Sequence, residues 1–243
     1  MRWITNPGRT AGLIYLLLVL AAPLRLIVIP SKLFVTGDAA RTAANILSHE
    51  FLFRLGIVAD VFCAVVLIFL TIAFYDLFRG VSKKLAVMVV LFGGVLPAAI
   101  DFFNVMNDAA TLLLLKGAPF LSVFTEAQRY ALGMLFMRMH THEVFAAETL
   151  WGLWLLPLAA LVYKADFFPR FARIGLGIWL TLNGFSYIAQ SFVDLLLPRY
   201  QGLAEIVGFP LQLGEVALVL WLVIMGSTHV TAPAKSSQSS LSP

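Results

Sequence analysis

The sequence predicts an all-α membrane protein, a bundle of helices that crosses the bilayer several times. Hydrophobic residues make up 60% of the 243 residues, charged residues make up only 12%, and the mean hydropathy is +0.91. A soluble domain carries about a quarter charged residues, so this chain lacks the polar surface that keeps a domain in water. The apolar runs are continuous rather than alternating, which favours helices over the strands of a barrel.

Six stretches contain the roughly 20 mostly apolar residues that a helix needs to cross hydrocarbon. They are residues 11–29, 52–78, 85–115, 131–163, 172–197 and 205–226. The third and fourth are longer than a bilayer requires, and Pro97 and Pro157 are the expected kinks because proline removes a backbone donor. We therefore predict a single six-helix transmembrane domain, residues 1–230, followed by a disordered polar tail, residues 231–243.

The distribution of Lys and Arg predicts that both termini are cytoplasmic. The loops on the predicted inner side hold Arg2, Arg9, Arg79, Lys83, Lys84, Lys164, Arg170, Arg173 and Lys235. Those on the outer side hold Lys32, Arg41, Arg54, Lys116, Arg129 and Arg199. Inner loops of membrane proteins carry such an excess, so we expect a multi-pass protein of the cell membrane. The same flanks explain the net charge of +4 without a nucleic-acid partner.

Between the first two spans, residues 37–50 predict a short amphipathic helix on the outer side. Asp38 is a suitable N-cap, and the alanines that follow form a small apolar stripe at helical spacing. We expect this helix to lie on the bundle or at the level of the headgroups.

Polar side chains inside the spans are the candidate functional residues, because a charge at membrane depth costs about 2.5–3.5 kcal/mol. The third span carries Asp101, Asn104 and Asp108 on one face, and the fifth carries a similar stripe that begins at Asn183. Such stripes predict a shared polar pocket that opens to the outside. Its expected residues are Asp60, Asp101, Asn104, His140, Glu148, Tyr187, Gln190 and Glu215.

A purely structural explanation of these groups stays open. Amide side chains can join neighbouring helices by hydrogen bonds worth about 0.6 kcal/mol each. Carboxylates deep in the spans, such as Asp101, are costlier to bury, and Arg25 or Arg138 is the expected counter-ion. Asp108 and Asp194 lie near the predicted outer surface, where solvation alone explains them.

His140 and Glu148 are candidate ligands of a transition metal, since imidazole and carboxylate both suit zinc or iron. Positions eight apart on a helix differ by about 80°, so these two side chains can converge only through an ion or a water molecule. The sequence contains no HEXXH motif, GxSxG elbow or phosphate-binding glycine loop. A hydrogen-bonded pair without a metal explains the two residues equally well.

Five segments are distinctive: GRTAGLIYLLL at 8–18, GDAARTAANILSHEFLFRLGIVAD at 37–60, GLWLL at 152–156, FFPRFARIGLGIWL at 167–180 and GEVALVLWLVIMG at 214–226. They resemble a bacterial integral membrane family catalogued as domain of unknown function 4386. The resemblance spans residues 8–226 and implies a multi-helix membrane protein, without an activity or a site. His140 falls where such sequences often carry histidine, whereas Glu143 and Glu148 depart from the glycine or apolar residues found there.

We therefore expect a membrane protein that binds a small molecule or a lipid in its outer pocket, or regulates a partner. An intramembrane hydrolase that acts on lipids, with or without a metal, is one alternative. A carrier is the other, although carriers usually contain paired repeats that this sequence lacks.

Overall fold

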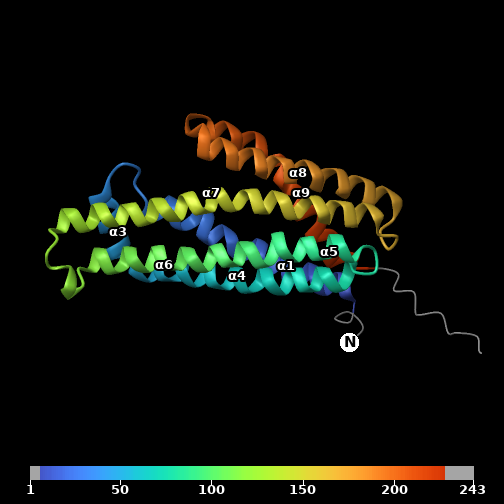
Figure 1. The fold of residues 1–243 in the computed structure, drawn as a ribbon, viewed down its shortest axis with the longest axis horizontal. Helices are drawn as coiled ribbons and strands as arrows, with labels where there is room; N and C mark the ends of the chain where they lie inside the picture. The colour runs from blue at the N-terminus through green and yellow to red at the C-terminus, as the bar shows by residue number, and fades with distance from the viewer. Residues whose placement is uncertain (1–5, 228–243) are drawn as a thin grey trace, which may run out of the picture.

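The computed structural model describes residues 6–227 as a bundle of helices (Figure 1). The α-helices are α1 (Pro7–Pro23), α2 (Ile29–Leu33), α3 (Ala39–Ser48), α4 (Glu50–Phe78), α5 (Lys83–Val90), α6 (Leu96–Lys116), α7 (Glu126–Lys164), α8 (Arg170–Leu196) and α9 (Gln201–Ile224). π-helical turns occupy Leu24–Val28 and Leu91–Val95, and 3₁₀ turns occupy Pro119–Leu121 and Pro198–Tyr200. No strand occurs within residues 6–227, which confirms the predicted all-α class. The predicted tail, residues 231–243, lies outside the described residues.

Five helical stretches are long and apolar enough to cross a membrane. They are Pro7–Leu33, Glu50–Phe78, Lys83–Lys116, Glu126–Lys164 and Pro198–Ile224. They coincide with five of the six predicted spans. The remaining predicted span, residues 172–197, corresponds to α8, which is long enough at 27 residues but carries several polar side chains along its length. The chain is thus a multi-pass membrane protein by the length and composition of its helices.

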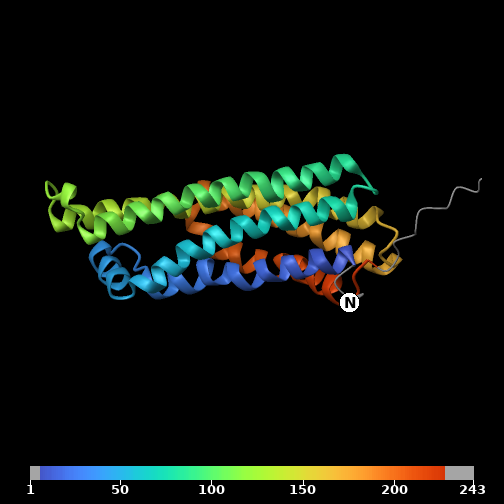
Figure 2. The same ribbon diagram turned by 90° about the horizontal axis from the view of Figure 1, so that it is seen from below.

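The long helices form a closed ring in the order α1, α4, α6, α7, α8 and α9, and α9 packs back against α1. Figures 1 and 2 show α1, α4, α6 and α7 running along the long axis of the molecule. In both views α8 and α9 lie beside only part of α7 and turn back before they reach α3. The end of the bundle around α3 is therefore built without α8 and α9.

Each π-helical turn immediately precedes a proline. The amide of Ile29 donates to the carbonyl of Leu24, and that of Leu96 to Leu91, so both bonds reach back five residues instead of four. Pro30 and Pro97 follow, and a proline ring collides with the carbonyl four residues before it, which widens the turn. The irregularity at the predicted kink site Pro97 is the π-helical turn Leu91–Val95. At Pro157, the other predicted kink site, α7 continues as an α-helix.

The short helix predicted between the first two spans is α3. The Asp38 side chain accepts a hydrogen bond from the amide of Arg41 at 2.9 Å, which is the predicted N-cap. Thr42, Ala43 and Ile46 are buried on one face, and α3 contacts α7. The helix therefore lies on the bundle, the first of the two predicted positions.

Two hydrophobic cores fill the ring. The larger lies toward the chain ends and includes Tyr15, Phe74, Trp154 and Leu218, among others. The smaller lies toward α3 and is made of Ile29, Leu33, Ala43, Ile46, Phe53, Leu112, Leu115 and Met137. Between these two sets, α4, α6 and α7 carry most of the buried polar side chains of the described residues, so a layer rich in polar groups separates the cores.

Helices α7 and α8 approach most closely at Gly152 and Gly184. A Cβ atom added to Gly152 would collide with the carbonyl oxygen of Gly184 and the side chain of Ile188. Small residues at helix crossings let the two backbones approach closely and gain van der Waals contacts. In a bilayer the hydrophobic effect does not bring helices together, so these contacts matter more.

We predict that Gly152→Ala destabilises the protein by about 1–3 kcal/mol, because the backbone of α8 must shift to accept the methyl group. Gly175→Ala on α8 is the matched control, since no atom lies within 4 Å of its added Cβ. The measurement is the free energy of unfolding in mixed micelles. Equal effects of the two substitutions would show that the crossing is loosely packed.

Candidate functional site

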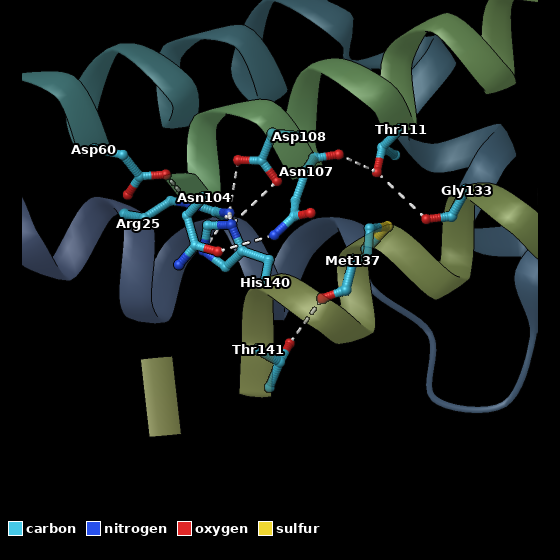
Figure 3. Close-up of polar contacts among 10 residues, drawn as sticks. All are labelled: Arg25, Asp60, Asn104, Asn107, Asp108, Thr111, Gly133, Met137, His140 and Thr141. Atoms are coloured by element: carbon cyan, nitrogen blue, oxygen red, sulfur yellow. Dashed lines mark hydrogen bonds and ion pairs between the residues drawn. The ribbon is translucent and has the colours of Figure 1, made fainter. Parts of the chain in front are cut away.

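The polar layer between the cores is centred on the guanidinium group of Arg25 (Figure 3). Its Nε donates to Asp60 Oδ2 at 2.8 Å, and its Nη2 donates to Asp108 Oδ2 at 2.8 Å. Nη2 also lies 2.7 Å from Nε2 and 2.9 Å from Nδ1 of His140. The four side chains come from four elements, the first π turn, α4, α6 and α7. We call them the Arg25 cluster.

Local structure explains how Arg25 reaches this place. It belongs to the π turn that Pro30 enforces, and a widened turn redirects the side chains that it carries. Opposite it, α4 has Gly56, whose missing Cβ leaves room for Arg25 Cδ and for Ile29. A larger residue at Gly56 would push α4 away from the first helix and separate Arg25 from Asp60.

Amide and hydroxyl groups continue the polar layer along α6 (Figure 3). Asn107 Nδ2 donates to Asn104 Oδ1 at 3.2 Å, and Thr111 Oγ1 lies 3.0 Å from the carbonyl of Asn107 and 3.3 Å from that of Gly133. The first two bonds lie within α6, and the bond to Gly133 ties α6 to α7. Buried polar groups are stable only when they are paired, and this side of the layer meets that condition.

The Arg25 cluster is buried almost completely. Arg25 is 5% exposed, Asp108 1% and His140 8%. One guanidinium and two carboxylates carry a formal charge of −1 with a neutral imidazole and zero with an imidazolium. Taking each ion out of water costs several kcal/mol, so the attraction between them must offset that cost. Each charge therefore depends on the presence of the others.

A metal does not fit this arrangement. One ligand atom each of Asp60, Asp108 and His140 lie within 4.8 Å of one another, and such a donor set suits zinc or iron. The guanidinium of Arg25, however, contacts all three side chains at 2.7 to 2.9 Å and supplies the positive charge that an ion would bring. A metal would have to displace a cation that is already bonded in place.

A second polar network lies among α7, α8 and α9. Gln190 Nε2 donates to Glu148 Oε1 at 3.4 Å, and Gln212 Nε2 donates to Gln190 Oε1 at 2.9 Å. Thr149 and Ser191 share a hydroxyl hydrogen bond of 2.8 Å beside them. Asp194 lies next to Glu148. We call these residues the α7–α9 network.

Glu215 lies deeper, at the centre of the larger core. The Tyr15 hydroxyl donates to Glu215 Oε1, and the hydroxyl of Tyr187 also contacts this carboxyl group. Asn183 Nδ2 approaches Glu215 Oε2 at 3.5 Å. This network joins α1, α8 and α9 by neutral donors around a single carboxyl group, an arrangement typical of interhelical pairing.

Two apolar grooves run along the sides of α7. The first, of about 540 Å³, lies between α7 and α8 and has Lys164 at its inner end. The second, of about 390 Å³, lies between α6 and α7 and is lined by Leu96, Ala99, Ile100, Phe103, Glu143, Ala146 and Leu150. Glu143 Oε2 is buried and has no hydrogen-bond partner among the described residues. An acceptor in that position lacks the donor that its burial requires.

The structure separates the predicted pocket residues into distinct groups. Asp60, Asn104 and His140 meet in the polar layer, whereas Glu148 and Gln190 belong to the α7–α9 network. Tyr187 and Glu215 form the deeper network. Neither groove is lined by these eight residues, so the single shared pocket remains a prediction.

A shared pocket predicts that Asp101 approaches Tyr187, Gln190 or Glu215 on α8 and α9, and the packing of the helices does not bring them together. Helix α6 packs against α4 and α7, and α7 lies between α6 and α8. Asp101 is half-buried on the α4 side, within electrostatic range of Asp60 and Cys63. A stripe on α6 therefore cannot reach the facing stripe on α8, although both are amphipathic.

The metal ligands predicted from the sequence, His140 and Glu148, contact different partners. His140 contacts Arg25 and Asp108, and Glu148 contacts Gln190 and Asp194. On the continuous helix α7 they lie about 12 Å apart along the axis. The pairing stays a prediction that no described contact supports.

Sequence reasoning also misjudged three residues. Arg25 pairs with Asp60 and Asp108 rather than with Asp101 or Glu215, and Arg138 is exposed. Asp108 and Asp194 are 1% and 4% exposed, so neither is solvated as expected. A single arginine inside an otherwise apolar run was the available signal, because such a charge requires a carboxylate on a neighbouring helix.

Comparison with known proteins gives one match. A family model described as Domain of unknown function (DUF4386) matches residues 10–226. No curated protein and no solved structure matches the chain.

We predict that Arg25→Met destabilises the protein by about 3–5 kcal/mol, because two buried carboxylates lose their counter-ion while the apolar side chain fills the same space. Arg54→Met is the control, since Arg54 pairs with Glu50 on the surface and should contribute less than about 1 kcal/mol. Unfolding in mixed micelles measures both.

A triple variant separates charge from packing. Arg25→Met combined with Asp60→Asn and Asp108→Asn removes all three charges and should recover most of the lost stability. If Arg25→Met is as stable as Arg54→Met, the Arg25 cluster does not hold the helices together.

Proposed function

This chain belongs to the family described as domain of unknown function DUF4386, and we propose that it is a six-span protein of the cell membrane that binds an amine-headed lipid. The site is the groove between α6 and α7, with Glu143 at its outer end. The observation that carries the proposal is the buried oxygen of Glu143, which has no donor among the described residues. Binding of a lipid, without chemistry on it, is the function that this geometry supports best.

The contact between the two ends of the bundle supports six spans. Asn6 Nδ2 donates to the carbonyl of Ser227 at 2.8 Å, and the amide of Ser227 donates to Asn6 Oδ1 at 2.9 Å. The start of α1 and the end of α9 therefore lie on the same side. An odd number of crossings would separate them, so this contact supports a crossing by α8 in addition to the five more apolar stretches.

Charged residues on α7 support a position for the bilayer. Between Glu143 and Lys164 lie 20 residues, of which only Glu148 is charged. A helix of that length spans about 30 Å, the thickness of the hydrocarbon layer. Lys164 then marks the cytoplasmic boundary, where the basic loops cluster, and Glu143 the outer one. The part of α7 before Glu143, which is more than two fifths of the helix, then extends beyond the layer together with α3.

The groove between α6 and α7 fits an acyl chain in the outer half of the bilayer. Phe103 and Glu143 lie at its outer end, and Leu96 and Leu150 lie about 10 Å further in, because seven residues separate each pair along its helix. Apart from Glu143, its lining side chains are apolar. A hydrocarbon chain can therefore fill the groove while its headgroup reaches the carboxylate.

The chemistry of Glu143 favours a primary amine in that headgroup. A carboxylate accepts hydrogen bonds, and an ammonium group donates them and also balances the negative charge. A quaternary choline group has no hydrogen to donate, and a glycerol headgroup beside an anionic phosphate brings no positive charge. Ethanolamine is therefore the headgroup class that satisfies Glu143 best.

Cysteine labelling in intact cells tests the topology in a Cys63→Ala background. Arg199→Cys, in the turn between α8 and α9, should react with a reagent that cannot cross the membrane. Asp166→Cys, in the exposed loop between α7 and α8, should react only after the membrane is opened. Reaction of both positions from the same side would show that α8 does not cross.

Lipid retention tests the ligand. Native mass spectrometry of protein incubated with phosphatidylethanolamine, phosphatidylcholine or phosphatidylglycerol of identical chains should show preferential retention of phosphatidylethanolamine. Glu143→Gln should weaken that retention about tenfold, because a charge-assisted hydrogen bond contributes about 1.5–3 kcal/mol. Glu126→Gln, at the exposed start of the same helix, is the control.

A further variant tests the groove itself. Ala146→Leu fills the groove with a larger side chain and should reduce retention of all three lipids by a similar factor. Equal retention of the three lipids by the unaltered protein, or a Glu143→Gln variant with unchanged preference, would rule out the amine-headed ligand.

A further inference from the structure

A pair of carboxyl groups in the α7–α9 network is unrelated to the lipid groove. Glu148 and Asp194 are 7% and 4% exposed and lie close enough to interact directly. Glu148 Oε1 accepts a hydrogen bond from Gln190. The two carboxyl groups contact each other, and outside that contact the other three oxygens, Glu148 Oε2 and both Oδ atoms of Asp194, have no hydrogen-bond partner among the described residues.

The described contacts provide no positive charge for this pair. The ion pairs among residues 6–227 join other acidic residues to Lys, Arg or His, and neither Glu148 nor Asp194 takes part in one. The next charged group in range is Glu205, which adds negative charge. Two adjacent carboxylates at the edge of the hydrocarbon layer require a cation or a proton to offset their charge.

The number of unpaired oxygens distinguishes these two possibilities. A single proton shared between the groups would pair one oxygen of Glu148 with one of Asp194 and leave the third oxygen without a partner. A cation can contact all three at once. Ca²⁺ takes six to eight oxygen ligands and accepts bidentate carboxylates, and two carboxylates balance its charge.

A second contact joins the same two helices. Thr149 and Ser191, each close in sequence to one of the carboxylates, share a hydroxyl hydrogen bond of 2.8 Å. We infer that Glu148 and Asp194 form a binding site for a hard divalent cation of the calcium type, which joins the middle of α7 to the last turn of α8. Mg²⁺ should bind more weakly, since it requires a smaller octahedral shell and retains its waters.

Trp151 makes the site measurable. It lies one helical turn from Glu148 and its ring contacts that of Tyr187 at a centroid distance of 5.8 Å. Tb³⁺, a luminescent substitute for Ca²⁺, should therefore emit when Trp151 is excited in purified protein that has been treated with a chelator. Ca²⁺ should displace Tb³⁺ at lower concentrations than Mg²⁺ does.

Substitutions of the two carboxylates test whether the cation binds between them. Asp194→Asn and Glu148→Gln should each weaken Ca²⁺ competition about tenfold or more, whereas Asp166→Asn in the exposed loop should leave it unchanged. Trp151→Phe should lose most of the sensitised emission but keep the rise in melting temperature that Ca²⁺ causes, which separates binding from loss of fold.

Two results would overturn the inference. The first is an unaltered protein that shows neither sensitised emission nor stabilisation by Ca²⁺. If the stability of that protein changes with pH alone, the two carboxyl groups share a proton and bind no cation. The second is a folded Asp194→Asn variant that binds Tb³⁺ as tightly as the unaltered protein. Because no lipid enters this experiment, its failure would leave the lipid groove untouched.

Discussion

Arg25 must be neutralised inside the bundle, and the arrangement of four of the helices follows from that requirement. The guanidinium group cannot reach water, so it is bonded to carboxylates on α4 and α6 and contacts an imidazole on α7. Each of these partners is itself buried and needs the arginine in return. The cluster therefore fixes which helices are neighbours and how far each can slide along the others, whereas apolar packing alone would tolerate several registers.

The polar layer also divides the molecule into two parts of different construction. On the side of the chain ends, six helices surround a large aromatic core. On the side of α3, only the first helix, α4, α6 and α7 continue, and α3 packs across them. With 39 residues, α7 is about 58 Å long and exceeds even the 40–45 Å of a bilayer that includes its headgroups. Helices α8 and α9, with 27 and 24 residues, are about 40 and 36 Å long and do not exceed that thickness.

Unpaired acceptors lie near the proposed outer boundary of the bilayer. Glu143 faces an apolar groove, and Glu148 and Asp194 face each other. All three provide oxygens that their surroundings leave without donors. By contrast, the amide and hydroxyl groups on α6 are bonded to the backbone or to one another. The paired groups on α6 are part of what holds the helices together, whereas the unpaired oxygens of Glu143, Glu148 and Asp194 are the basis of the two binding sites proposed above.

The sequence by itself determined the class of fold, the positions of the helices and the presence of α3 with its Asp38 cap. These properties depend on hydropathy, helical spacing and local capping, all of which are carried by residues close together in the chain. It also identified most of the buried polar residues, because a charge in an apolar run stands out wherever it lies. It did not determine their partners: Asp101 was assigned to the wrong neighbours, and Asp108 and Asp194 were taken for solvated groups. Partnership depends on the order of helices around the ring, which is set by contacts between distant residues such as Arg25 and His140, 115 positions apart. The π turn before Pro30 then directs Arg25 toward those partners. Only the tertiary structure contains that information. A polar stripe on one helix can face either of two neighbouring helices without any change in the helix's own hydrogen bonding or capping.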